Sequence, residues 1–200
     1  MLYFLPSPLK GILSLLFYTV NTIFMTTPLI ALSFFKFIAP AHGFVVVLDK
    51  ILISIANLWI GINSFNSKLF CKIEWDIRGL EKLEPNEWYL VLSNHQSWVD
   101  ILALQTTLNR KIPMLKFFIK KELIWIPFLG LAWWALDFPF MKRYSKHQLK
   151  RKPYLKGKDL ENTKKACEKF KHTPVTIMNF VEGTRFTPQK KGSQNNHFTH

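Results

Sequence analysis

The sequence has little cysteine and no sign of a metal site or a disulfide framework. Only Cys71 and Cys167 occur among 200 residues, and their separation does not fit the short ligand spacing of a zinc site. Two distant thiols exclude the dense cross-linking of small secreted domains, and they fit a reducing compartment. No internal repeat is visible, and the length suits one domain of ordinary size.

Glycine is also scarce, whereas large apolar side chains are abundant. The chain has 8 glycines against 18 phenylalanines and 7 tryptophans, and 48% of its residues are hydrophobic. This composition is rich for a soluble domain. It therefore indicates contact with a membrane.

Acidic residues are few: 13 against 27 basic ones, which gives a formal net charge of +14. The excess is uneven, because residues 110–172 hold 17 of the basic residues and only 5 of the acidic ones. Such a basic field attracts polyanions, so it predicts nucleic acid, anionic lipid or a phosphate-bearing cofactor as partner. A solvated basic face that holds the protein at an anionic membrane is at least as good an interpretation.

A long uncharged run near the N-terminus predicts a membrane anchor. Residues 11–35 carry no charged side chain. As a helix they would be about 37 Å long, enough to cross a hydrocarbon core of about 30 Å. A secretory signal peptide has a shorter apolar core. We therefore expect a retained anchor, with a kink at Pro28.

A second apolar stretch covers residues 43–65 but is interrupted by Asp49 and Lys50. Its longest uncharged part, residues 51–65, is short for a full span. The sequence fits either a hairpin of two helices embedded in one leaflet or two full spans. Basic residues follow, and the positive-inside rule then puts the rest of the chain on the cytoplasmic side. These basic residues are Lys68, Lys72 and Arg78.

The remaining chain alternates strand and helix patterns. Period-two alternation and short apolar runs predict strands, whereas apolar residues three or four apart predict helices. The predicted strands cover residues 71–78, 88–93, 138–141 and 175–181, and the predicted helices cover 98–108, 122–136 (buried or interfacial) and a segment from Asp159 or Asn162 to Lys171. The polar tail from Phe186 is predicted to be disordered. This order predicts an α/β fold, a sheet flanked by helices, preceded by a two-helix N-terminal membrane anchor.

A histidine and an aspartate stand where a predicted strand runs into a predicted helix. His95 follows the strand at 88–93, and Asp100 comes three residues after Ser97, as in a capping box. A carboxylate that hydrogen-bonds one imidazole nitrogen leaves the other nitrogen as a base. A loop histidine beside an ordinary capping aspartate would give the same pattern.

Polar groups follow three of the predicted strands. Asn94 and His95 follow one strand, Lys142-Arg143 follow another, and Glu182-Gly183-Thr184-Arg185 follow the last. The carboxyl ends of parallel neighbouring strands meet at one edge of a sheet. A base beside two arginines suits the deprotonation of an alcohol on a phosphorylated substrate, because arginine binds phosphate in a bidentate manner. Gly183 lets the backbone approach a ligand closely.

Taken together, these motifs resemble the glycerolipid acyltransferases, the PlsC-type 1-acylglycerol-3-phosphate acyltransferases. Asn94, His95 and Asp100 match the first family block, residues 140–143 match the second, and residues 180–185 match the third. Each motif alone is weak or moderate, but the set in this order and spacing is specific. The resemblance covers the chain to about residue 188. The longer strings at 126–132, 138–145 and 180–187 are similar to the YihG-like inner-membrane branch of the family.

The resemblance implies a membrane acyltransferase that moves a fatty acyl group from acyl-CoA, or from acyl carrier protein, to the free hydroxyl of a lysophospholipid. His95, oriented by Asp100, would be the base, and backbone N–H groups near the second or third block would stabilise the oxyanion. The residues expected to bind substrate are Asn94, Arg143, Glu182, Gly183, Thr184 and Arg185.

The same resemblance implies a set of partners. These are membrane lipids, the lysophospholipid acceptor and the acyl donor, with no nucleic acid, no metal and no permanently bound cofactor. The implied location is the cytoplasmic side of the inner membrane.

Two residues and the end of the chain depart from the family pattern. Val181 stands where proline is common and Asp137 where glycine is common; neither change removes a reacting group. A fourth block of the type Val-Pro-x-x-Pro does not follow, so we expect a truncated chain with an incomplete sheet. The expected division is an anchor over 1–68, a partial acyltransferase domain over 69–188 and a disordered tail over 189–200.

Two other functions fit parts of this sequence. One is an inactive truncated fragment that only associates with the membrane. The other is a basic, membrane-tethered binder of anionic lipid or nucleic acid, which the positive charge alone would support.

Overall fold

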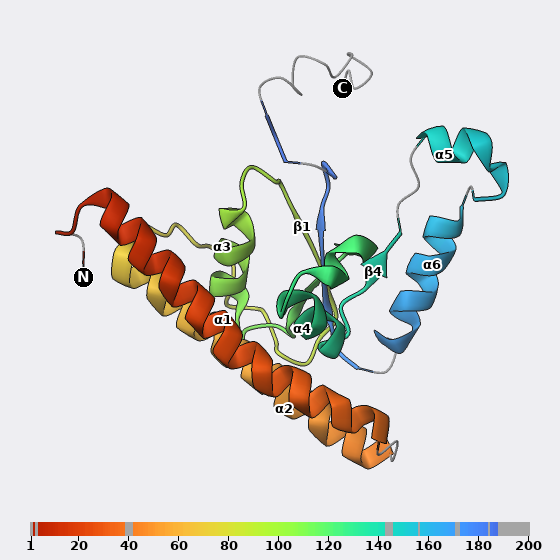
Figure 1. The fold of residues 1–200 in the computed structure, drawn as a ribbon, viewed down its shortest axis with the longest axis horizontal. Helices are drawn as coiled ribbons and strands as arrows, with labels where there is room; N and C mark the ends of the chain where they lie inside the picture. Colours follow the sequence, from red (N-terminus) through yellow and green to blue (C-terminus); the bar gives the residue numbers. More distant parts are fainter. Residues whose placement is uncertain are drawn as a thin grey trace.

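A computed structural model of the chain has two parts, a long helical hairpin and an α/β domain that lies along one side of it (Figure 1). The hairpin consists of α1 (Ser7–Ile38) and α2 (His42–Phe70). The structure describes residues 2, 4–38, 42–142, 146–155, 157–170, 173–183 and 185–187.

Polar side chains hold the two hairpin helices together. The Asn21 side chain donates to Oδ1 of Asn63 at 2.7 Å, and the Tyr18 hydroxyl lies 2.7 Å from the Ser67 hydroxyl. Apolar side chains cover the outer faces instead, with Phe24 71% exposed. A helix in the core of a soluble protein would instead bury its apolar face.

Both hairpin helices pass a length and composition test for membrane spans, over Ser7–Lys36 and Gly43–Phe70. Core helices and N-terminal signal sequences pass the same test. In this chain only 22% of the most apolar part of each helix is buried, so these are not core helices. The apolar composition near the N-terminus thus forms an exposed surface.

The α/β domain packs against the hairpin through a shared apolar core. Leu29 of α1 and Leu52 of α2 are almost completely buried, and they cluster with Ile119, Ala132 and Phe138 of the domain. Polar contacts lie at both ends of this core. Near the hairpin turn, Lys36 pairs with Asp49 and Asp137, and near the end of α2 the Ser64 and Thr106 hydroxyls lie 2.9 Å apart.

The main sheet has three parallel strands in the order β1-β5-β2. They are β1 (Tyr89–Ser93), β2 (Leu115–Phe117) and β5 (Thr176–Phe180). Val91 and Phe117 both pair with Met178, which is buried on the central strand. Since the strands are parallel, their carboxyl ends share one edge.

A second, two-stranded sheet pairs β3 (Ile119–Lys120) with β4 (Phe140–Met141), also in parallel. The surrounding helices are α3 (Val99–Leu108), η1 (Lys121–Trp125), α4 (Leu129–Ala135), α5 (Lys146–Arg151), η2 (Pro153–Leu155), α6 (Lys158–Cys167) and η3 (Glu168–Phe170). Leu108 at the end of α3 packs with Ile112, Leu115 and Met178 to form the core beneath the sheet.

Several sequence predictions need correction against this fold. The alternating segment 71–78 is not a strand: its residues are exposed and pair with no strand of the described chain. Alternation supplies one apolar face, but a strand also needs a hydrogen-bonded neighbour. The predicted helix over 122–136 is broken into η1 and α4 around Pro127, because proline removes a helical donor and restricts the residue before it.

The predicted strand at 88–93, the helix at 98–108 and the final strand at 175–181 are confirmed to within a residue or two. β1 and β5 lie inside the predicted ranges 88–93 and 175–181, and α3 begins one residue after the predicted start of the helix at 98–108. The strand at 138–141 is shortened to β4, whereas β2 and β3 were not predicted. The expected tail 189–200 lies outside the described residues, and the expected incomplete sheet stays a prediction.

Candidate active site

His95 lies just beyond the carboxyl end of β1, where the chain turns toward α3. Its side chain is only 12% exposed. The imidazole ring stacks on Phe180, the last residue of β5, with ring centroids 3.9 Å apart and an interplanar angle of 17°. The neighbouring strand therefore fixes the plane of the imidazole.

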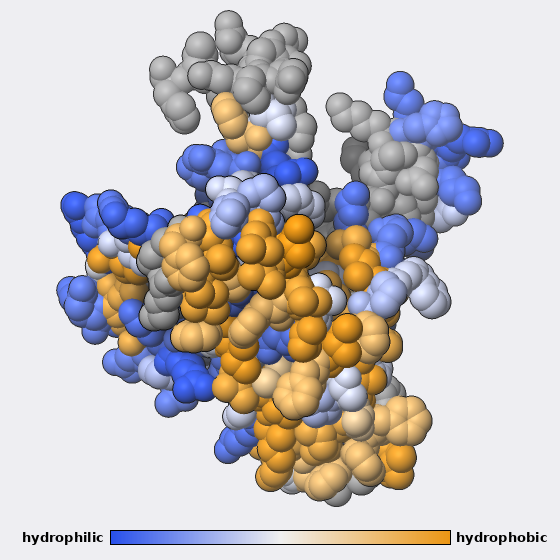
Figure 2. Space-filling view, turned by 60° about the vertical axis from the view of Figure 1, so that its left-hand side comes forward, coloured by the Kyte–Doolittle hydropathy of each residue, from blue (hydrophilic) through white to orange (hydrophobic). Residues whose placement is uncertain are grey.

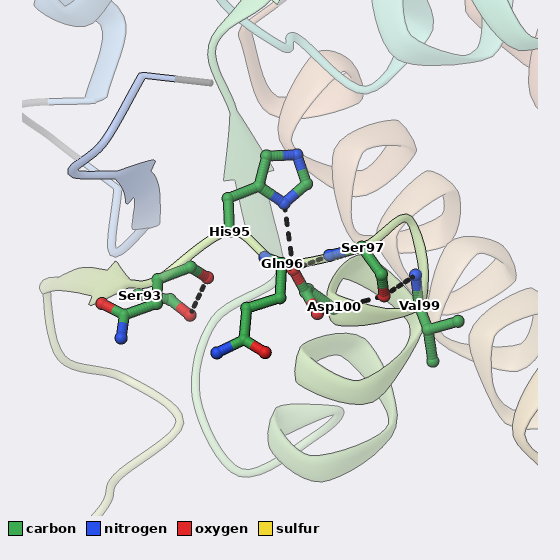
Figure 3. Close-up of polar contacts among 7 residues, drawn as sticks. Ser93, His95, Gln96, Ser97, Val99 and Asp100 are labelled. Atoms are coloured by element: carbon green, nitrogen blue, oxygen red, sulfur yellow. Dashed lines mark hydrogen bonds and ion pairs between the residues drawn. The ribbon is translucent and has the colours of Figure 1, made fainter. Parts of the chain in front are cut away.

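Asp100, in the first turn of α3, holds the histidine from the other side (Figure 3). Its Oδ2 lies 3.0 Å from His95 Nδ1 and also accepts hydrogen bonds from the backbone N–H groups of Gln96 at 2.6 Å and Ser97 at 2.8 Å. The Ser97 hydroxyl accepts from the Val99 N–H at 3.1 Å. The bond from the Ser97 N–H to Asp100 is one half of the capping box expected from the sequence, whereas the Ser97 hydroxyl accepts from Val99 instead of from the Asp100 N–H.

The hydrogen bonds around Asp100 determine its charge. Burial acts to raise the pKa of the carboxyl, but the hydrogen bonds from Ser97, His95 and Gln96, with Coulomb attraction to His95, outweigh burial and hold the pKa below its usual value. Asp100 is therefore ionised at neutral pH. An ionised carboxylate favours a proton on Nδ1 of His95, which leaves Nε2 as the basic nitrogen.

The histidine borders a cavity of about 400 Å³ that lies between the strand ends and η1. Its walls are mainly apolar, with Phe117, Trp133 and Met178 among them. Two cationic side chains, Lys120 and Arg185, also line it. An apolar cavity with few polar groups is the usual form of a small-molecule site.

The segment after β5 reaches the cavity beside the histidine. Gly183 has a φ of 64°, a left-handed conformation that favours glycine. The Phe186 N–H then donates to the His95 carbonyl at 2.7 Å, so the chain after β5 is tied to the chain after β1. Arg185, one residue earlier, lies over the Trp98 ring with its Cζ 4.8 Å from the ring centroid.

The structure brings together four of the predicted site residues: His95, Asp100, Gly183 and Arg185. Asn94 and Glu182 are exposed and do not line the cavity. Arg143 and Thr184, the other two predicted substrate-binding residues, lie outside the described residues. All the proposed roles stay predictions.

Sequence reasoning missed three residues of the site, Trp98, Lys120 and Phe180, as members with roles of their own. Both aromatic residues lie inside the recognised motifs, where Trp98 is one of the spacing positions between His95 and Asp100 and Phe180 belongs to the predicted strand at 175–181. Lys120 ends β3, and β3 was not predicted. In the described part of the chain, no group of three or more His, Cys, Asp or Glu side chains is placed to hold a metal ion.

Comparison with known proteins assigns the chain to a family. A family model described as Acyltransferase matches residues 74–197, more than half of the chain. The chain belongs to the acyltransferase family. The matched range contains the histidine, its aspartate and both cationic residues of the cavity.

Individual acyltransferases are similar over shorter regions. A mouse and a human 1-acyl-sn-glycerol-3-phosphate acyltransferase alpha are 34% and 36% identical over 79 and 72 residues, which are 39% and 36% of this chain. An Arabidopsis thaliana 1-acyl-sn-glycerol-3-phosphate acyltransferase 3 is 31% identical over 114 residues, 54% of the chain. These alignments span 26%, 24% and 27% of the relatives' own lengths. No solved structure was found to match the chain.

Proposed function

We propose that this acyltransferase moves a fatty acyl group from acyl-CoA, or from acyl carrier protein, to the free hydroxyl of 1-acylglycerol-3-phosphate. One observation carries the proposal. A histidine held by an ionised aspartate lies beside Arg185 in a largely apolar cavity. The names of the similar mouse, human and Arabidopsis proteins support the choice of acceptor.

The reaction begins with a proton transfer to His95. Nε2 takes the proton from the acceptor hydroxyl while Asp100 stabilises the imidazolium through Nδ1. The resulting alkoxide oxygen attacks the thioester carbonyl, and the tetrahedral intermediate collapses with cleavage of the carbon–sulfur bond. The imidazolium then returns its proton to the departing thiolate, so protons balance over one turnover.

The cavity matches the two ends of the acceptor. The guanidinium of Arg185 and the ammonium of Lys120 attract the phosphate group, since both cations line the same cavity as the histidine. The aromatic and methionine walls accommodate hydrocarbon. No metal takes part in this scheme.

We also propose that the hairpin lies along one leaflet of a membrane instead of crossing it. The domain contacts the hairpin at two distant points. Asp137 of the domain pairs with Lys36 near the hairpin turn, and Thr106 contacts Ser64 near the end of α2. Lys36 also pairs with Asp49 of α2, which is 15 residues before Ser64, so the two points are about 22 Å apart along the helix. A perpendicular span would draw part of the polar domain into the hydrocarbon, which is costly.

The surface supports the same orientation. Apolar residues (orange) predominate on the face in Figure 2 from the lower end of the molecule to its middle, and hydrophilic residues border them. Exposed apolar side chains continue from the hairpin onto η1 and α4, where Trp125 is 85% exposed. On this proposal the cavity opens close to the lipid that supplies the acceptor. The basic residues after the hairpin favour the cytoplasmic leaflet of an inner membrane.

The decisive test combines acyl-CoA with a panel of lysolipids in vesicles and follows release of free thiol together with the lipid product. We expect thiol release that depends on 1-acylglycerol-3-phosphate and equals the phosphatidate formed. An analogue that lacks the accepting hydroxyl is the matched control and should release no thiol. Salt-sensitive vesicle binding without thiol release would support the lipid-binding alternative instead.

A further inference from the structure

Trp98 occupies an unusual place between the histidine and its aspartate. Its indole is 67% exposed, although large aromatic side chains are generally buried. Trp98 directly precedes α3, so its side chain is set by the turn that also carries His95 and Asp100. An exposed tryptophan at the mouth of a cavity calls for a role other than core packing.

The indole contacts one specific group across the cavity mouth. The Arg185 Cζ lies 4.8 Å from the ring centroid, within the range of a cation–π contact. Both residues line the cavity that contains His95. The contact therefore joins the turn after β1 to the segment after β5 at side-chain level, in addition to the backbone bond from Phe186 to His95.

The contact with the indole restricts the directions that the Arg185 guanidinium can take. A cation–π contact engages the charge of the guanidinium, and its paired N–H groups are donors suited to phosphate oxygens. An arginine side chain that is already ordered loses less conformational entropy when its ligand binds.

We propose that Trp98 is a positioning residue that holds Arg185 in the orientation that receives the acceptor phosphate. This inference rests on the proposed function, because it specifies how the same site binds a phosphorylated acceptor. Trp98 touches neither the reacting hydroxyl nor the thioester in this scheme. Its removal weakens acceptor binding and leaves the proton transfer at His95 intact.

The rival role for an exposed tryptophan near an apolar surface is attachment to lipid headgroups. The two roles predict different effects of Trp98→Phe and a different dependence of the Trp98 substitutions on Arg185. If Trp98 stacks on Arg185, Trp98→Phe largely preserves acceptor binding and Trp98→Leu weakens it. In a chain without Arg185, neither substitution changes acceptor binding further. A lipid-attachment role does not depend on Arg185.

The kinetic test measures KM for 1-acylglycerol-3-phosphate and kcat in vesicles for Trp98→Phe, Trp98→Leu, Arg185→Ala and the double variant Trp98→Leu/Arg185→Ala. We expect Trp98→Leu to raise KM by about tenfold with kcat within about twofold, as loss of one cation–π contact implies. Trp98→Phe should stay within about threefold of the wild type. The double variant should have the same KM as Arg185→Ala, because the Trp98 contact has no effect once Arg185 is absent.

Tyr154→Leu is a matched control, because Tyr154 is also an exposed aromatic residue stacked on a cation, Lys158, at 5.5 Å. It lies outside the cavity lining, so its kinetics should equal those of the wild type. An equal loss in Trp98→Phe and Trp98→Leu, or an additive loss in the double variant, overturns the inference.

A binding measurement separates this inference from the proposed reaction. In a His95→Ala background, calorimetric titration with a short-chain lysophosphatidate reports the Kd without turnover. We expect Trp98→Leu to weaken the Kd by about tenfold. If the ligand binds in this way but the wild type transfers no acyl group, only the proposed reaction fails. Equal Kd values with and without Trp98, or no binding by either protein, overturn the inference itself.

Discussion

Asp100 orients His95, the proposed base, through one oxygen atom. Its Oδ2 meets His95 Nδ1 and two backbone N–H groups at the same time. The backbone donors fix the carboxylate, and the carboxylate fixes the imidazole tautomer. The orientation of His95 therefore depends on this local turn of six residues together with the stacking on Phe180 of β5.

Asp100→Asn should leave the fold intact and lower kcat by about 10²–10⁴-fold, because an amide no longer favours the productive tautomer or stabilises the imidazolium. The measurement is the rate of phosphatidate formation at saturating substrates. Ser93→Ala is a suitable control, since the Ser93 hydroxyl donates to the adjacent Asn94 carbonyl. Equal rates for Asp100→Asn and the wild type would contradict the assignment.

The same aspartate makes a pH-dependent contribution to stability. Its pKa is lower in the folded chain than its usual value, so its stabilisation is fully present above the usual value and is lost as pH falls through the lowered one. We expect the melting temperature of Asp100→Asn to lie below that of the wild type at pH 7, and the gap to narrow in acid. Thermal denaturation of both proteins at pH 7 and in acid tests this. The same difference in melting temperature under the two conditions would count against it.

At the scale of elements, a close backbone contact joins η1 to α4. A Cβ added to Gly130 would lie 1.9 Å from the Ile124 backbone oxygen. This contact folds the broken apolar segment back on itself and explains why Pro127 and Gly130 occur together. The sequence indicated the break through these two residues, but it did not reveal the contact.

Gly130→Ala should destabilise the chain by about 1–3 kcal/mol, as expected for overpacking against backbone. Gly61→Ala is the matched control, because Gly61 lies within α2 and a Cβ there meets nothing within 4 Å. That control should be neutral or slightly stabilising. Chemical denaturation of both variants provides the comparison, and equal stabilities would show that the contact is unimportant.

The elements that sequence reasoning found are those with strong local signals. β1 and β5 are apolar runs closed by polar motifs, and α3 follows a capping pattern. β2 and β3 are only three and two residues long, so they carry too little periodicity to be recognised. Segment 71–78 has the alternation of a strand but no partner in the described chain, and pairing is a tertiary property that alternation cannot supply.

The site residues, like the elements, could be predicted in part from the sequence. The carboxyl-end rule for parallel strands correctly brought His95 and Arg185 together, since both follow strands of one sheet. Asn94 and Glu182 occupy the same motifs but are exposed and do not line the cavity. A motif gives the spacing of its residues, whereas the direction of each side chain depends on the turn that the backbone makes.

At the scale of the whole molecule, the hairpin and the domain form one continuous unit. The shared core around Leu29 and Leu52, with the Lys36 ion pairs at one end, holds the domain beside the hairpin. The sequence left open whether the hairpin spans a membrane twice or lies in one leaflet, because length and hydropathy are the same in both cases. Packing against a polar domain favours one leaflet.

This orientation predicts that both ends of α1 and α2 are accessible from the same side of a vesicle. Single cysteines at Ser7 and Gly43, introduced into a chain with Cys71→Ser and Cys167→Ser, should both react with a membrane-impermeant maleimide added outside. The natural cysteine at residue 71, restored alone, serves as the positive control because it is exposed. Protection of the Gly43 position alone would indicate two full spans.

The central claim is that His95 is the base of an acyl transfer to a lysophospholipid. The most direct measurement is phosphatidate formation from acyl-CoA and 1-acylglycerol-3-phosphate by His95→Ala, compared with His147→Ala, an exposed histidine on α5. We expect His95→Ala to lose activity by about 10²–10⁴-fold, with unchanged vesicle binding, and His147→Ala to match the wild type. Substantial turnover by a correctly folded His95→Ala protein would contradict the account.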